Sequence, residues 1–115
     1  MRVLIAEDSV AIADMLAMAL EFADVEVVKV TSDFASLLTP EPWQGVDAAV
    51  LDLLLGGMDG EDIVRYLAAD HPGVKRVVFS AVAHQREGLS DLATCISKPV
   101  DPRSLLAALG VRDDA

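Results

Sequence analysis

Short apolar runs alternate with segments of helical spacing along the whole chain. Five runs rich in Val, Ile and Leu have the length and composition of buried strands, at residues 2–6, 25–30, 48–52, 75–80 and 94–97. Between them, apolar residues recur three and four positions apart, which is typical of one face of a helix. This order of elements predicts an α/β fold, with a parallel sheet covered by helices on both faces.

Three of the intervening segments begin with a helix-start signal. Ser9 is a candidate N-cap for the first, Gly60 precedes the second, and Asp101 is an N-cap followed by proline for the third. Weaker helical patterns lie at residues 33–38 and 85–92. The residues expected to face the core are Ile12, Met15, Leu16, Ala19 and Leu20, then Ile63, Val64, Leu67 and Ala68, and finally Leu105, Leu106 and Leu109.

Length and composition fit one domain. The chain has 115 residues, 53% of them hydrophobic, which is enough for one well-packed core and too few for two. Glycine and proline are spread along the chain without repeats or low-complexity blocks, so no linker is expected. We therefore predict a single domain over residues 1–115, with no output domain within them.

The formal net charge of −10 narrows the classes of partner. Direct binding to nucleic acid requires clustered Lys and Arg, so this charge argues against it. The apolar run at the N-terminus reaches Glu7 after too few residues for a secretory leader or a membrane span. We therefore expect a cytoplasmic protein. The single cysteine, Cys95, lies in a short apolar stretch and is expected to be a small buried thiol.

Polar residues gather where the predicted strands end. The first strand ends in Glu7 and Asp8, the third in Asp52, the fourth in Ser80 and the fifth in Lys98. Open α/β sheets bind ligands at the carboxyl ends of their strands, so these side chains should surround one crevice. Two carboxylates about 4 Å apart repel by roughly 4 kcal/mol at an effective dielectric of about 20. A divalent cation would offset this repulsion.

The residue types favour a particular cation and a particular ligand. Carboxylate oxygens, without a cluster of His and Cys, favour Mg²⁺ over zinc. Lys98 supplies a positive charge suited to a phosphate oxygen, and Ser80 supplies a hydroxyl donor. The pattern therefore indicates acids and a lysine around a cation and an anionic group.

Four short strings resemble the signatures of response-regulator receiver domains, the phosphoacceptor domains of two-component signalling. They are the acidic pair at 7–9, the strand and loop at 51–60, the Ser-Ala pair at 80–81 and the lysine-proline motif at 96–99. They stand in the family's order and span essentially the whole chain. The resemblance implies a flavodoxin-like, doubly wound (βα)5 domain with sheet order 2-1-3-4-5.

The resemblance also implies a function. Asp52 would accept a phosphoryl group from a phosphohistidine on a sensor histidine kinase or a histidine phosphotransfer protein, forming an acyl phosphate. Lys98 would pair with the phosphate, and the hydroxyl of Ser80 would move in to bind it. The chain would be a signalling domain acting on an unknown downstream protein, and would assist only its own phosphorylation and dephosphorylation rather than act as an enzyme on other substrates.

The same resemblance implies a set of metal ligands. Asp8 and Asp52 would bind Mg²⁺ directly, Leu54 would contribute its backbone carbonyl, and Glu7 would act through a bound water. The metal would neutralise charge on the phosphoryl oxygens during transfer. In this family the peptide bond before the proline of the lysine-proline motif is usually cis, so a cis bond is expected between Lys98 and Pro99.

The chain also departs from the family pattern. Gly56 stands where proline is common, and Cys95 stands where many receivers carry a switching Tyr or Phe. The stretch from Ser80 to Lys98 is shorter than usual, which predicts a reduced fourth helix. The face made by the fourth helix, fifth strand and fifth helix, where partners or a second copy usually bind, is therefore expected to be unusual. Gly60 is expected to permit a tight turn.

Three other classes fit parts of this pattern. A phosphatase of the haloacid-dehalogenase type would need a second Asp at the position of Leu54. A nucleotide-binding module would need a glycine-rich loop where the first strand instead runs into Glu7 and Asp8. A degenerate receiver, acting as a phosphorylation-independent interaction module, is the alternative that the intact acids and Lys98 oppose.

Overall fold

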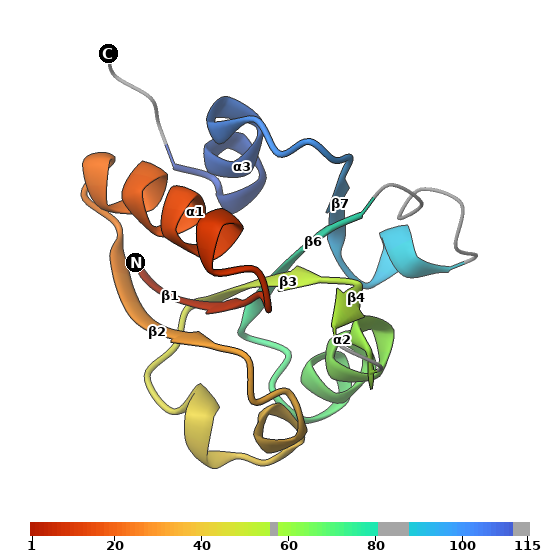
Figure 1. Cartoon of the computed structure of the whole chain (residues 1–115). Helices are drawn as coiled ribbons and strands as arrows, with labels where there is room; N and C mark the ends of the chain where they lie inside the picture. Colours follow the sequence, from red (N-terminus) through yellow and green to blue (C-terminus); the bar gives the residue numbers. More distant parts are fainter. Residues whose placement is uncertain (56–57, 81–87, 112–115) are drawn as a thin grey trace.

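A computed structural model of the chain describes residues 1–55, 58–80 and 88–111 (Figure 1). In these residues five parallel strands form one sheet in the order β2-β1-β3-β6-β7. This is the predicted order 2-1-3-4-5, and each predicted strand boundary is correct to within one residue. The strands are β1 (Arg2–Ala6), β2 (Glu26–Thr31), β3 (Ala48–Asp52), β6 (Lys75–Phe79) and β7 (Thr94–Ile96).

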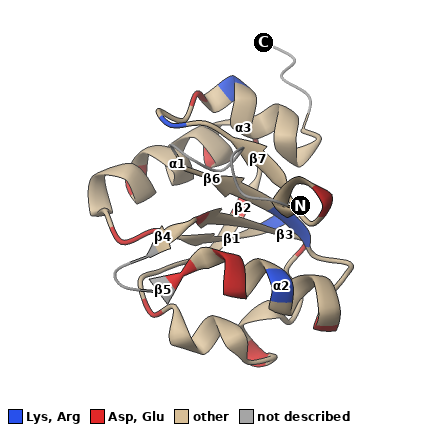
Figure 2. Ribbon diagram, turned by 90° about the vertical axis from the view of Figure 1, so that its right-hand side faces the viewer, with Lys and Arg blue, Asp and Glu red and all other residues tan. Residues whose placement is uncertain are grey.

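Helices cover both faces of the sheet, as predicted. Helices α1 (Val10–Phe22) and α3 (Pro102–Leu109) lie against one face, and α2 (Gly60–Asp70) lies against the other (Figures 1 and 2). Side chains along a strand point to alternate faces, so β1 contributes to two cores. Val3 packs with the α1 and α3 side, and Leu4 packs with the α2 side.

The predicted N-caps of α1 and α3 agree with the structure, but one residue of α1 was wrongly predicted to face the core. The Ser9 hydroxyl accepts the Ile12 N–H at 3.4 Å, and Asp101 caps α3. Met15, predicted to face the core, is 42% exposed, and Ala13 is buried in its place. At 3.6 residues per turn Met15 lies about 100° from Leu16, which puts it outside the buried stripe. The inward residues of α2 and α3 were predicted correctly, apart from partial exposure of Ala68.

Of the two weaker helix predictions, the first was wrong and the second is described only in part. Residues 33–38 contain only a 3₁₀ turn, Ala35–Leu38, followed by a second one at Glu41–Trp43. The Trp43 indole donates to the Leu37 carbonyl at 2.8 Å, so these turns cover the sheet in place of a helix. In the described part of the predicted fourth helix there is a 3₁₀ turn, Leu89–Asp91. This agrees with a reduced helix, although residues 81–87 lie outside the described part of the chain.

The strand register brings the polar strand ends to one edge of the sheet. Ala6 pairs with Leu51, so Glu7 and Asp8 lie beside Asp52. Asp52 pairs with Phe79, which precedes Ser80, and Phe79 pairs with Ile96, two residues before Lys98. Beyond Asp52 the chain forms a short antiparallel pair that the sequence did not predict, β4 (Leu54–Leu55) with β5 (Met58–Asp59).

Candidate functional site

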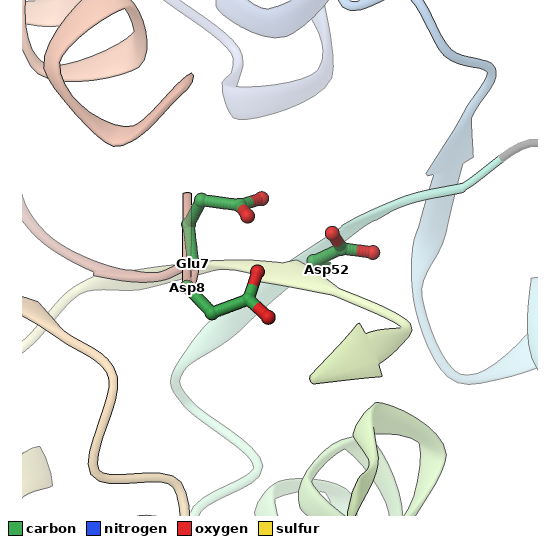
Figure 3. Close-up of side chains that lie close together, drawn as sticks. All are labelled: Glu7, Asp8 and Asp52. Carbon is green, nitrogen blue, oxygen red and sulfur yellow. The ribbon is translucent and has the colours of Figure 1, made fainter. Parts of the chain in front are cut away.

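Three carboxylates meet at this edge. One carboxylate oxygen from each of Glu7, Asp8 and Asp52 lies within 4.8 Å of the others. Figure 3 shows the two acids at the end of β1 beside Asp52 at the end of β3. Glu7 and Asp52 are buried, whereas Asp8 is exposed to solvent. The predicted cluster of acids is therefore present, and its open side is at Asp8.

Both carboxylate oxygens of Asp52 are held by hydrogen-bond donors. Oδ1 accepts the Leu54 N–H at 3.0 Å, and Oδ2 accepts from Lys98 Nζ at 2.9 Å. Asp52 is only 2% exposed, so this pairing offsets the cost of burying its charge. Lys98 also lies over the ring of Phe79, 5.7 Å from its centroid, and the peptide bond from Lys98 to Pro99 is cis, as expected.

Glu7 is the acid with the least satisfied carboxylate. Its Oε1 accepts the Ser9 N–H at 2.9 Å, but its buried Oε2 has no hydrogen-bond partner among the described residues. Burial, and after it the nearby carboxyls of Asp8 and Asp52, raise the pKa of Glu7 to about 7, although the Ser9 N–H opposes this shift in part. Without a cation, this site therefore favours a bound proton near neutral pH.

The donor set fits a hard divalent cation. All three side chains present oxygen, and the oxygens are close enough to share one ion. A cation would also supply the partner that the Oε2 of Glu7 lacks. The arrangement therefore has the chemistry of a site for a hard divalent cation, and Lys98 places a positive charge beside Asp52.

Ser80 and Leu54 lie next to this cluster. Ser80 follows Phe79, the register partner of Asp52, and is buried, and its N–H donates to Ile96 O at 3.2 Å. Leu54 has an exposed side chain and contacts Asp52 through its backbone. The predicted roles of the Ser80 hydroxyl and the Leu54 carbonyl stay predictions. Gly56 and the Ala81 of the Ser-Ala pair lie outside the described residues.

Cys95 differs from its prediction. It is half-buried rather than fully buried, and its Sγ lies 3.8 Å from Ala93 O. Burial raises the pKa of the thiol, which favours its protonated form.

An apolar stripe on the surface of α1 was not predicted from the sequence. Met15, Met18 and Phe22 recur at helical spacing on the exposed side, and Met18 and Phe22 are 70% and 94% exposed. The helix contains no Lys or Arg (Figure 2). The helix runs from Val10 to Phe22, so the stripe extends from its middle to its C-terminal end. The signal was present in the sequence as a second apolar face on this helix. In the part of the chain that the structure describes, no helix is long and apolar enough to span a membrane.

Comparisons with known proteins agree with this geometry. A sequence model of the response regulator receiver domain matches residues 3–110. The DNA-binding response regulator MtrA of Mycolicibacterium paratuberculosis is 32% identical, over 96% of this chain and 50% of MtrA. The chain therefore spans about half the length of the curated relatives it matches.

Solved structures have the same fold. A CheY-like response regulator receiver domain protein from Methanospirillum hungatei is 28% identical with a TM-score of 0.73, covering 95% of this chain and 90% of that chain. A sensor protein from Polaromonas is 29% identical with a TM-score of 0.79, covering 95% of this chain and 92% of that chain.

Proposed function

Because this chain belongs to the response regulator receiver domain family of two-component signalling, we propose that Asp52 accepts a phosphoryl group from a phosphohistidine. A carboxylate oxygen of Asp52 attacks the phosphorus, the P–N bond breaks, and the histidine ring leaves with the bonding electrons. The observation that carries this proposal is the pairing of buried Asp52 with Lys98 beside two further acids. An unpaired buried aspartate would be costly, whereas Lys98 compensates the charge of Asp52 and is placed to bind a phosphoryl oxygen as well.

Mg²⁺ is the cation we propose for the cluster. Asp8 and Asp52 would hold it directly, the backbone carbonyl of Leu54 would add a ligand, and Glu7 would act through a water. When bound, the ion would neutralise the negative charge on the phosphoryl oxygens during transfer. Burial of Glu7 and Asp52 supports this assignment, because their charges need a counter-ion once both are ionised.

Lys98 and Ser80 would hold the phosphorylated product. Lys98 Nζ now binds Asp52 Oδ2, and it would exchange this contact for a phosphoryl oxygen. The Ser80 hydroxyl would bind another phosphoryl oxygen. Both residues lie at the ends of neighbouring strands, β6 and β7, so their movement would shift the equilibrium of that edge between two states. Cys95 lies on β7 in place of a switching aromatic, so this output would depend on backbone movement.

The proposed phosphodonor is a sensor histidine kinase or a histidine phosphotransfer protein. The exposed stripe of Met15, Met18 and Phe22 supports a protein donor, because it gives such a partner an apolar surface on α1, the helix that follows Glu7 and Asp8 in the chain. We propose that the chain acts as one receiver domain over residues 1–115 and passes its signal to another protein. Its charge of −10 disfavours direct contact with DNA, although relatives such as MtrA are DNA-binding.

The downstream face is less defined. A homodimer through the region around η4 (Leu89–Asp91), β7 and α3 stays a prediction, because part of that region lies outside the described residues. The alternative of a phosphorylation-independent interaction module is disfavoured by the Lys98 to Asp52 contact and the intact acids.

Intact-mass spectrometry tests the proposal. Wild-type protein incubated with acetyl phosphate should gain the mass of one phosphoryl group when Mg²⁺ is present and none when the metal is chelated. Asp52→Asn should abolish the gain, whereas Asp62→Asn, which removes an exposed acid of α2, should leave it intact. Labelling that persists in Asp52→Asn would refute the assignment. If only a partner kinase labels the wild-type chain and Asp52→Asn abolishes that labelling, the acceptor would be confirmed and the small-molecule route excluded.

A further inference from the structure

The first residue of α2 touches the backbone of the proposed phosphoacceptor. A methyl group built on Gly60 would collide with the carbonyl oxygen of Asp52, and would lie 2.9 Å from Leu53 Cα and 3.2 Å from Leu53 O. All three neighbours are main-chain atoms of the strand end, which cannot rotate away as a side chain could. The sequence predicted a tight turn at Gly60, whereas in the structure this close approach is what requires glycine.

The segment that carries the proposed ligands is fastened on both sides. The Leu53 N–H donates to Phe79 O at 3.3 Å in the sheet, and the Gly60 N–H donates to Leu53 O at 2.8 Å from the helix. Leu54 pairs with Asp59 in the short β4–β5 ladder. The segment from Asp52 to Leu54 is therefore held between the sheet and the start of α2.

From these contacts we infer that Gly60 is a positioning residue for the metal site: its lack of a side chain lets α2 hold Asp52 and the Leu54 carbonyl in place. This inference rests on the proposed function, which makes both groups metal ligands. A Cβ at position 60 would require the backbone of either α2 or the strand end to shift by at least a few tenths of an ångström. Metal–ligand distances tolerate only about 0.2 Å, so movement of the strand end would weaken the site.

The test compares two Gly→Ala variants by Mg²⁺ titration calorimetry. Gly60→Ala should raise the Mg²⁺ dissociation constant by about tenfold, the scale of changes to groups that orient metal ligands. Gly73→Ala is the matched control, because a Cβ there meets nothing within 4 Å, and its dissociation constant should change by less than about twofold. Alanine is the better helix former, so a loss at position 60 could not be attributed to helix propensity.

A second measurement covers the case in which Gly60→Ala does not fold. In the wild-type chain, Mg²⁺ should slow hydrogen exchange of the Gly60 amide, because that amide binds the segment that the metal would fasten. The His71 amide, which donates to Leu67 O at 2.8 Å at the other end of α2, should not respond. A Gly60→Ala variant with wild-type Mg²⁺ affinity, or a Gly60 amide unaffected by bound Mg²⁺, would overturn the inference.

The outcomes also separate this inference from the proposed function. A wild-type chain that binds Mg²⁺ but accepts no phosphoryl group from any donor would remove the proposed function, and Mg²⁺ affinity would still decide the role of Gly60. A wild-type chain that is phosphorylated, together with a Gly60→Ala variant that binds Mg²⁺ normally, would keep the function and remove the role of Gly60.

Discussion

Replacing Glu7 by Gln tests the electrostatics of the acidic cluster without metal. The folded protein holds the Glu7 proton more tightly than the unfolded chain does, since the pKa rises from 4.5 to about 7 on burial. The folded state therefore loses stability as pH rises through this window. Glutamine is the same shape, can still accept the Ser9 N–H through its carbonyl oxygen, and carries no charge.

The size of the effect follows from the same shift. A tenfold change in proton affinity corresponds to about 1.4 kcal/mol, so keeping Glu7 charged at pH 8 costs the folded state about 3 kcal/mol. At pH 5 most of this cost is absent, because folded Glu7 is protonated. In chelator-treated protein, Glu7→Gln should therefore raise the free energy of unfolding by about 2 kcal/mol more at pH 8 than at pH 5, or about 8 °C in Tm.

Urea denaturation and thermal melts at the two pH values measure this difference, first with chelator and then with saturating Mg²⁺. Bound Mg²⁺ should cancel or reverse the advantage of the variant, because the ion stabilises the charged Glu7 of the wild type. An equal effect of Glu7→Gln at pH 5 and pH 8 would show that the Glu7 proton is not held by burial. A loss of stability at pH 8 would show that the buried charge already has a partner.

Four further predictions concern the site, the docking surface and the core. Asp8→Ala should weaken Mg²⁺ binding by at least about tenfold in a calorimetric titration, as expected for loss of a direct ligand; unchanged affinity would remove Asp8 from the ligand set. Lys98→Met should slow labelling of Asp52 by acetyl phosphate by about 10²-fold, since it removes a charge at the transferring group; a normal rate in the mass assay would contradict this. The double change of Met18→Gln and Phe22→Gln should slow transfer from a phosphohistidine protein but leave acetyl phosphate labelling unchanged; equal slowing of both would exclude a docking role. Leu67→Ala should cost about 2–5 kcal/mol in urea denaturation, because the side chain is fully buried between α2 and the sheet; a cost below about 1 kcal/mol would show that the core closes over the gap.

The sequence by itself determined most of the architecture and the chemistry of the site. Buried parallel strands need apolar residues on both faces, so β1 and β3 were evident from composition, and the N-caps at Ser9 and Asp101 marked two helices. The acids at the strand ends followed from the rule that parallel strands end at one edge. The helix predicted at 33–38 was wrong, and the described part of 85–92 contains a 3₁₀ turn, because local propensity is weak and tertiary packing decides such short segments.

Only the tertiary structure decided which groups meet. Residues 46 positions apart form the contact between Asp52 and Lys98, and no local pattern gives its 2.9 Å distance or the unpartnered oxygen of Glu7. Whether Met15 is buried or exposed depends on how α1 is rotated about its axis against the sheet. The spacing of the apolar residues did not fix this rotation to within one residue. The contact of Gly60 with Asp52 arises from two elements packed backbone to backbone. Sequence periodicity describes one element at a time, whereas distances between elements come from packing, and the site is made of those distances.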